Sequence, residues 1–167
     1  MKMRKGFTLV ELLIVIVIIG ILAAAMLLSS GSATASAEAS NIVNNLRSLK
    51  SATVMFYADS MDAIAANQGG LPSGTNIDAL KNYTDNPTNF DDGKGYLFAS
   101  NADKRWFVGV QLDNANLKRS SKVEEIVKKL EGKKDTLSLI STANTTPPTN
   151  TTPAITAGHK VIWMLAR

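Results

Sequence analysis

The chain begins with a long apolar segment that carries a single carboxylate. After a short basic leader, this segment runs from Phe7 to Leu28, and its one charged residue is Glu11. As an α-helix, at about 1.5 Å per residue, it would span about 33 Å, which matches the roughly 30 Å hydrocarbon core of a bilayer. The pattern therefore predicts a transmembrane helix. A carboxylate near the start of such a helix is costly and indicates a functional role.

Residues 29–66 continue the predicted helix with an amphipathic pattern. Apolar positions recur at intervals of four and three residues, which is typical of a helix that buries one face. The predicted buried stripe is Ile42, Leu46, Leu49, Thr53 and Phe56, widened by Val43, Val54, Tyr57, Met61 and Ile64. Four charged residues fall mainly on other faces and are predicted to be solvated: Arg47, Lys50, Asp59 and Asp62. The two segments together predict one helix of roughly 55–60 residues that ends before Asn67.

Residues 67–167 alternate loop-rich stretches with short strand and helix patterns. Glycines and prolines punctuate residues 67–95, where a helical turn is predicted from Ile77 to Tyr83 with Asn76 as its cap. Apolar runs predict strands at 96–98, 106–112, 136–142 and 160–166, and the first two are joined by a hairpin turn at 101–103.

Two segments between these strands carry their own signals. Ser121 and Glu124 have the spacing of a capping box, which predicts a short helix at about 121–131 with Gly132 as its C-terminal cap. Residues 144–154 are rich in Thr, Pro and Asn and are predicted to form an exposed loop.

These elements predict an α+β fold in which the long N-terminal helix packs on a sheet of three or four mostly antiparallel strands. A lone sheet cannot bury its apolar face, so the amphipathic half of the helix is its natural cover. The predicted organisation is a leader at 1–6, an apolar helix at 7–28, its amphipathic continuation at 29–66 and a sheet domain at 67–167.

The distribution of charge bears on topology more than on binding. The formal net charge of +4 falls to +1 without Lys2, Arg4 and Lys5 of the leader. Positive charge before a membrane segment favours a cytoplasmic N-terminus, so the remaining domain is predicted to lie outside the cytoplasm. The small residual charge gives no indication of nucleic-acid binding. The chain has no cysteine, so disulfides and thiolate metal sites are excluded.

No pattern of catalytic residues is present. His159 is the only histidine, and it lies beside Gly158 at the start of a predicted strand, where a surface or strand-edge position is expected. The serines show no nucleophile-elbow pattern, and no phosphate-binding glycine loop or zinc spacing occurs. An enzymatic function is therefore not predicted.

Two polar segments suggest ligands or modification. Asp85, Asp91 and Asp92 lie in an oxygen-rich loop that is a weak calcium candidate, but their spacing is not that of an EF-hand and a solvated turn is favoured. Asn144 and Asn150 begin glycosylation sequons, which we interpret as composition compatible with modification.

The N-terminal sequence resembles the leader and first helix of type IV prepilins. The similarity rests on KGFTLVELL at residues 5–13 and IGILAA at 19–24. It implies that a membrane prepilin peptidase cuts between Gly6 and Phe7 and methylates the new amine of Phe7. It also implies a role for Glu11 in filament assembly and the same α+β layout. Such helices often carry a proline near the end of the apolar run, where this chain has Leu28, so the class of filament stays open.

The resemblance also implies a set of partners. These are membrane lipid before assembly, an inner-membrane assembly platform, and other copies of the chain and related pilins in a helical filament. The predicted function is a structural subunit of a type IV pilus or a pilin-like filament. The main alternative is a pseudopilin of a type II secretion system, in a short periplasmic filament. A second is a signal-anchored surface binding protein that never polymerises. An ordinary secretory peptide, cut after Ala37, is disfavoured because its apolar region is usually about 7–15 residues and lacks a carboxylate.

Overall fold

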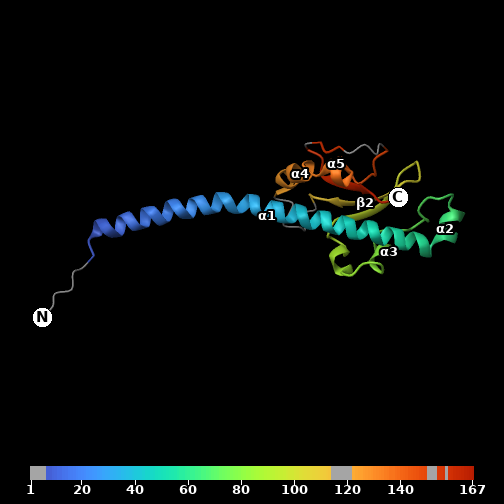
Figure 1. The fold of residues 1–167 in the computed structure, drawn as a ribbon, viewed down its shortest axis with the longest axis horizontal. Helices are drawn as coiled ribbons and strands as arrows, with labels where there is room; N and C mark the ends of the chain where they lie inside the picture. Colours follow the sequence, from blue (N-terminus) through green and yellow to red (C-terminus); the bar gives the residue numbers. More distant parts are fainter. Residues whose placement is uncertain (1–6, 114–121, 150–153, 157) are drawn as a thin grey trace. The chain divides into compact units, whose positions relative to one another are not determined.

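The computed structural model describes residues 7–113, 122–149, 154–156 and 158–167, without the side chains of residues 28–32. The chain divides into two compact units, Met1–Thr34 and Ala35–Arg167. Helix α1, Leu9–Asp59, contributes residues to both units (Figure 1). Each unit is described separately below.

The first unit is dominated by the apolar start of α1. Its stretch Leu9–Leu27 has a mean hydropathy of 3.0 and is wholly unburied. By length and composition this stretch can cross a membrane. Its Leu, Ile and Val side chains are exposed all around the helix, so they need lipid or another protein surface to cover them.

The second unit is a four-stranded antiparallel sheet covered by helix. The strands are β1 (Tyr96–Ser100), β2 (Trp106–Gln111), β3 (Leu139–Thr142) and β4 (Val161–Leu165). They lie in the order β1-β2-β4-β3, and every neighbouring pair is antiparallel. The predicted α+β fold class, with a long helix on a mostly antiparallel sheet, is confirmed.

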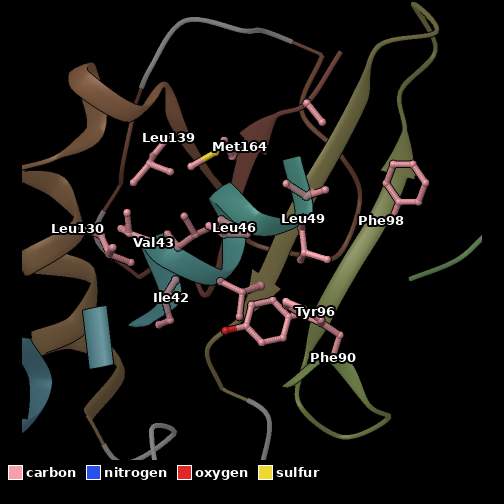
Figure 2. Close-up of a cluster of buried hydrophobic side chains, with 14 of the residues drawn as sticks. Ile42, Val43, Leu46, Leu49, Phe90, Tyr96, Phe98, Leu130, Leu139 and Met164 are labelled. Carbon is pink, nitrogen blue, oxygen red and sulfur yellow. The ribbon is translucent and has the colours of Figure 1, made fainter. Parts of the chain in front are cut away.

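The core lies between the second half of α1 and one face of the sheet. Figure 2 shows Ile42, Leu46 and Leu49 of α1 among side chains of the strands and of the C-terminal helical region. All five residues of the predicted stripe are buried: Ile42, Leu46, Leu49, Thr53 and Phe56. Thr53 satisfies its hydroxyl within the helix by donating to the Leu49 carbonyl at 2.8 Å.

The width of the buried face differs from the prediction. Val43 and Ile64 are buried as expected, but Val54 and Met61 are exposed, so their assignment to the core was wrong. Small residues instead extend the buried face, namely Ala35, Ala39 and Ala52. The short alanine side chains let the helix approach its neighbours closely, which larger residues would prevent.

The helices also depart from the prediction in detail. The single helix expected to residue 66 is interrupted at Ser60, after which α2 runs from Met61 to Ala66. Backbone bonds continue across the interruption, from Ser60 N–H to Phe56 O and from Ile64 N–H to Ser60 O, both 3.0 Å. The turn predicted at 77–83 contains α3 (Asp78–Lys81), followed by a 3-10 turn, η1 (Pro87–Phe90). Asn76 Oδ1 accepts the N–H of Asp78 at 3.0 Å, but the N-cap residue of α3 is Ile77 and not the predicted Asn76.

The C-terminal half contains one helix that the sequence patterns did not predict. Helix α4 spans Val123–Glu131, close to the predicted 121–131, whereas Ser121 of the predicted capping box lies outside the described residues. The strand predicted at 136–142 begins only at Leu139, because α5 (Lys134–Leu137) takes up the preceding residues. Ser138 adopts φ 51° between them, a left-handed conformation that ends the helical turn.

The second face of the sheet has its own apolar cluster, composed of Phe107, Ile140, Val161 and Trp163. Gly109 leaves room for the Trp163 ring, since a Cβ at Gly109 would lie 2.5 Å from that ring. The segment predicted as an exposed loop at 144–154 makes two contacts with the rest of the domain. Pro148 is buried and its carbonyl accepts a hydrogen bond from Asn101 Nδ2 at 3.0 Å. Ala154 forms a parallel bridge with Ile140 but is itself exposed, as are residues 143–146 and 149, so the predicted exposed loop is confirmed for these residues, with Pro148 as a buried exception.

Phe56→Ala is expected to destabilise the second unit by about 3–5 kcal/mol. The Phe56 ring makes edge contacts with Tyr83 and Phe98 and a tilted contact with Trp106, at centroid distances of 6.0–6.2 Å. Its loss leaves a cavity at the centre of this aromatic cluster. Chemical denaturation of the soluble domain beginning at Ala35 measures the change. Met55→Ala is the matched control, because Met55 is exposed, and equal loss in the two variants would contradict the assignment of the core face.

Candidate functional site

The start of α1 is organised by reciprocal hydrogen bonds between Thr8 and Glu11. Glu11 Oε2 accepts the backbone N–H of Thr8 at 2.8 Å and the Thr8 hydroxyl at 2.7 Å. In return, Thr8 Oγ1 accepts the backbone N–H of Glu11 at 3.3 Å. Because α1 begins at Leu9, the two residues form a capping box, in which each side chain satisfies a backbone donor that the helix leaves unpaired.

The capping box explains how an apolar segment can hold a carboxylate. The negative charge lies in the first turn of α1, where the helix dipole favours it. Oε2 accepts both hydrogen bonds from Thr8. Among the described residues, no hydrogen bond or ion pair of the Glu11 side chain involves Oε1. The carboxylate therefore has one oxygen engaged in its own helix and one that can receive another donor.

The surroundings of this capping box are strongly apolar. Phe7 is 84% exposed and Leu9 81% exposed, and the large apolar residues that follow them are exposed as well. Phe7 and Glu11 thus lie near the same end of a helix whose surface requires cover. Gly6, the other side of the predicted cleavage bond, lies outside the described residues, as does the basic leader at 1–6.

His159 is held by polar contacts with the neighbouring strand. Its Nδ1 lies 3.0 Å from both the hydroxyl and the carbonyl oxygen of Ser141. Ser141 is buried, and its hydroxyl accepts the N–H of Thr156 at 2.9 Å. None of these contacts brings a carboxylate to the imidazole. The geometry joins the segment before β4 to β3, at the strand-edge position expected for His159.

The three aspartates of the calcium candidate are not gathered into one site. Asp91 Oδ1 lies 3.0 Å from Lys81 Nζ, which also contacts Asp78 at 2.7 Å. The hydrogen bond to Asp78, and secondly that to Asp91, raises the pKa of the Lys81 amine, while the same lysine lowers the pKa of Asp78. Among the described residues, which include Asp85 and Asp92, no group of three or more His, Cys, Asp or Glu side chains converges as a metal site.

The sequons divide between the described and undescribed parts of the chain. Asn144 is exposed, and its Oδ1 accepts the N–H of Thr146 at 3.2 Å. Asn150 lies outside the described residues.

Comparison with protein families places a known motif at the N-terminus. Residues 1–27 match the model of the prokaryotic N-terminal methylation motif. Comparison with curated proteins finds no match, and comparison with solved structures finds none. The motif is typical of structural proteins that are processed by prepilin peptidase, and with the exposed apolar helix it indicates membrane anchoring. The resemblance of the N-terminal sequence is confirmed: the chain carries the type IV pilin and prepilin signature at residues 1–27.

Proposed function

We propose that the chain is a structural subunit of a type IV pilus or a related pilin-like filament. Prepilin peptidase cuts between Gly6 and Phe7 and methylates the new amine, and the processed chain polymerises through the start of α1. The observation that carries this proposal is the methylation motif at residues 1–27. The motif includes the apolar stretch Leu9–Leu27 of α1, which is wholly exposed. This motif is typical of structural proteins, which agrees with the proposed role of the chain as a filament subunit.

Before assembly, the subunit is stored in the cytoplasmic membrane. The basic leader keeps the N-terminus in the cytoplasm, and the stretch Leu9–Leu27 crosses the bilayer. The sheet domain then lies outside the cytoplasm. After polymerisation the subunit lies in a surface pilus or in a periplasmic pseudopilus, and the inner-membrane assembly platform transfers it from the bilayer.

In the filament, the apolar helices of neighbouring copies bundle and replace lipid as the cover of α1. The Phe7 ammonium of one copy pairs with Glu11 of another. The geometry at Glu11 supports this arrangement, because the capping bonds from Thr8 occupy only Oε2. The carboxylate can therefore accept the ammonium on Oε1 while still capping its own helix. This pairing also fixes the axial register between copies, since an unpaired charge in an apolar bundle costs several kcal/mol.

The alternatives remain a pseudopilin of a type II secretion system and a signal-anchored binding protein. The pseudopilin shares the leader and the helix, so its distinguishing property is a short filament confined to the periplasm. The anchored binding protein would remain monomeric in the membrane and retain its leader.

Electron microscopy of filaments sheared from cells, with peptide identification, tests the proposed function. We expect filaments that contain this chain, and mass spectrometry should find its N-terminus at methylated Phe7. A mature N-terminus at Glu38 would instead support the ordinary secretory peptide. Full-length monomer in membranes, without filaments, would support the anchored binding protein.

A further inference from the structure

The end of α1 and the start of α2 carry an apolar stripe that the core does not cover. Val54, Met55 and Met61 are each more than half exposed, at 59%, 54% and 55%. The helix residues that face the sheet are already buried in the core, so nothing in the described second unit covers these three side chains. Exposed apolar groups that gather on one face mark an interaction surface more often than groups scattered singly.

A carboxylate stands beside the end of this stripe. Asp62 follows Met61 in the first turn of α2, and among the described residues it has no ion-pair partner. Asp59 is different, because its carboxylate interacts with the Tyr83 hydroxyl and raises the pKa of Tyr83. We refer to Met61 together with Asp62 as the Met61 knob. It presents a flexible apolar side chain with a negative charge next to it.

A groove elsewhere on the same domain has the complementary chemistry. It lies between α1 and the α4–α5 turn and has a volume of about 280 Å³. The half-buried Leu137 supplies apolar lining over the buried Val43, and Arg47 and Lys133 supply two cations. No carboxylate is among its lining residues. The groove therefore suits an apolar side chain that is accompanied by an anion.

We propose that the Met61 knob of one copy docks into this groove of a second copy. Met61 contacts Leu137 at the surface of the groove, and Asp62 pairs with Arg47 or Lys133. The contact is between copies, because Val43 and Asp59 are separated by 16 residues of α1, which is about 24 Å along the helix. A knob and a groove on different surfaces make a head-to-tail contact that repeats along an open assembly. The inference thus rests on the proposed filament and assigns it a second contact, outside the apolar start of α1.

Engineered cysteines test the contact in filaments of the full chain, which has no cysteine of its own. Met61→Cys combined with Thr136→Cys, at the rim of the groove, is expected to give a ladder of disulfide-linked multimers after mild oxidation of sheared filaments. The matched control is Met61→Cys with Thr88→Cys, because Thr88 is also an exposed threonine and lies outside the groove. Filaments that give no ladder with the first pair, or equal ladders with both, would overturn the proposal.

Charge exchange provides a second measurement. Asp62→Lys should reduce the number of filaments per processed subunit by about tenfold or more, because it faces like charges across the contact. Combining it with Lys133→Asp or with Arg47→Asp should restore filaments. Asp103→Lys, an equal change of charge at an exposed hairpin position, should leave their number unchanged. Wild-type filaments together with a harmless Asp62→Lys would reject the knob and groove but keep the filament, whereas absence of wild-type filaments would reject the proposed function itself.

Discussion

Glu11→Val should abolish or severely reduce filaments while leaving membrane insertion and leader cleavage intact. Valine makes the segment more apolar, so anchoring is not what is lost. The Phe7 ammonium of the adjacent copy is left unpaired in an apolar bundle. Removing one member of a buried ion pair costs about 3–5 kcal/mol, which weakens association roughly a hundred- to several-thousand-fold. Counting sheared filaments from strains with equal amounts of processed subunit measures the effect.

The capping box at the start of α1 makes a sharper control possible. Glu11→Gln retains an oxygen that can accept the Thr8 bonds but removes the charge, whereas Thr8→Ala removes the hydroxyl of Thr8 but retains the carboxylate. If charge pairing drives assembly, Glu11→Gln should fail like Glu11→Val, and Thr8→Ala should form filaments. The reverse order would show that Glu11 acts only by capping its own helix. Glu11→Asp should be intermediate, because the charge remains but its reach is shorter.

Gly6→Val should leave nearly all of the protein as full-length precursor in the membrane. The glycine has no side chain, so the peptidase can approach the backbone closely at the bond to be cut. A branched side chain at this position blocks that approach. Intact-mass measurement of membrane fractions should then find Lys2, Arg4 and Lys5 still attached.

Gly20→Val is the matched control for the processing experiment. It introduces the same side chain into the same apolar segment, at a glycine where an added Cβ meets no atom within 4 Å. Its cleavage should equal that of the wild type. Full processing of Gly6→Val would refute cleavage between Gly6 and Phe7.

The helical part of the fold could be predicted from the sequence because its hydrophobic pattern is local and periodic. Spacings of three and four residues identified the stripe from Ile42 to Phe56. The same rule placed Val54 and Met61 in the core, since an apolar residue does not by itself reveal which face of a helix is covered. Ala35, Ala39 and Ala52 were missed because alanine has a weak hydrophobic signal, although its small size favours close packing of a helix.

The C-terminal half was harder to predict because short elements compete for the same residues. Leu137 and Thr136 fit a strand pattern, yet they belong to α5, which ends where Ser138 turns left-handed. The anchoring of the 144–154 segment depends on Asn101, which is 47 residues away from Pro148 in the chain. No local pattern reports such a contact.

The candidate sites also differ in whether a local sequence pattern or only the tertiary fold brings their residues together. Thr8 and Glu11 have the spacing of a capping box, so that contact was available from the sequence even though the resemblance directed attention to cleavage and assembly. The groove joins Arg47 to Lys133, which are brought together only by the tertiary fold. The sequence therefore indicates the N-terminal methylation motif and leaves lateral surfaces undetermined.

The reciprocal bonds between Thr8 and Glu11 also affect the kinetics of the proposed assembly. A bare carboxylate that moved from a bilayer into a helix bundle would meet a high activation barrier, since it would pass through an apolar surrounding without any donor. Here the backbone N–H and the hydroxyl of Thr8 stay hydrogen-bonded to the Glu11 carboxylate during the transfer. The charge therefore remains solvated by its own chain throughout the transfer, and the incoming ammonium adds a partner instead of replacing one. Thr8→Ala should consequently slow filament growth more than it lowers the final amount of filament.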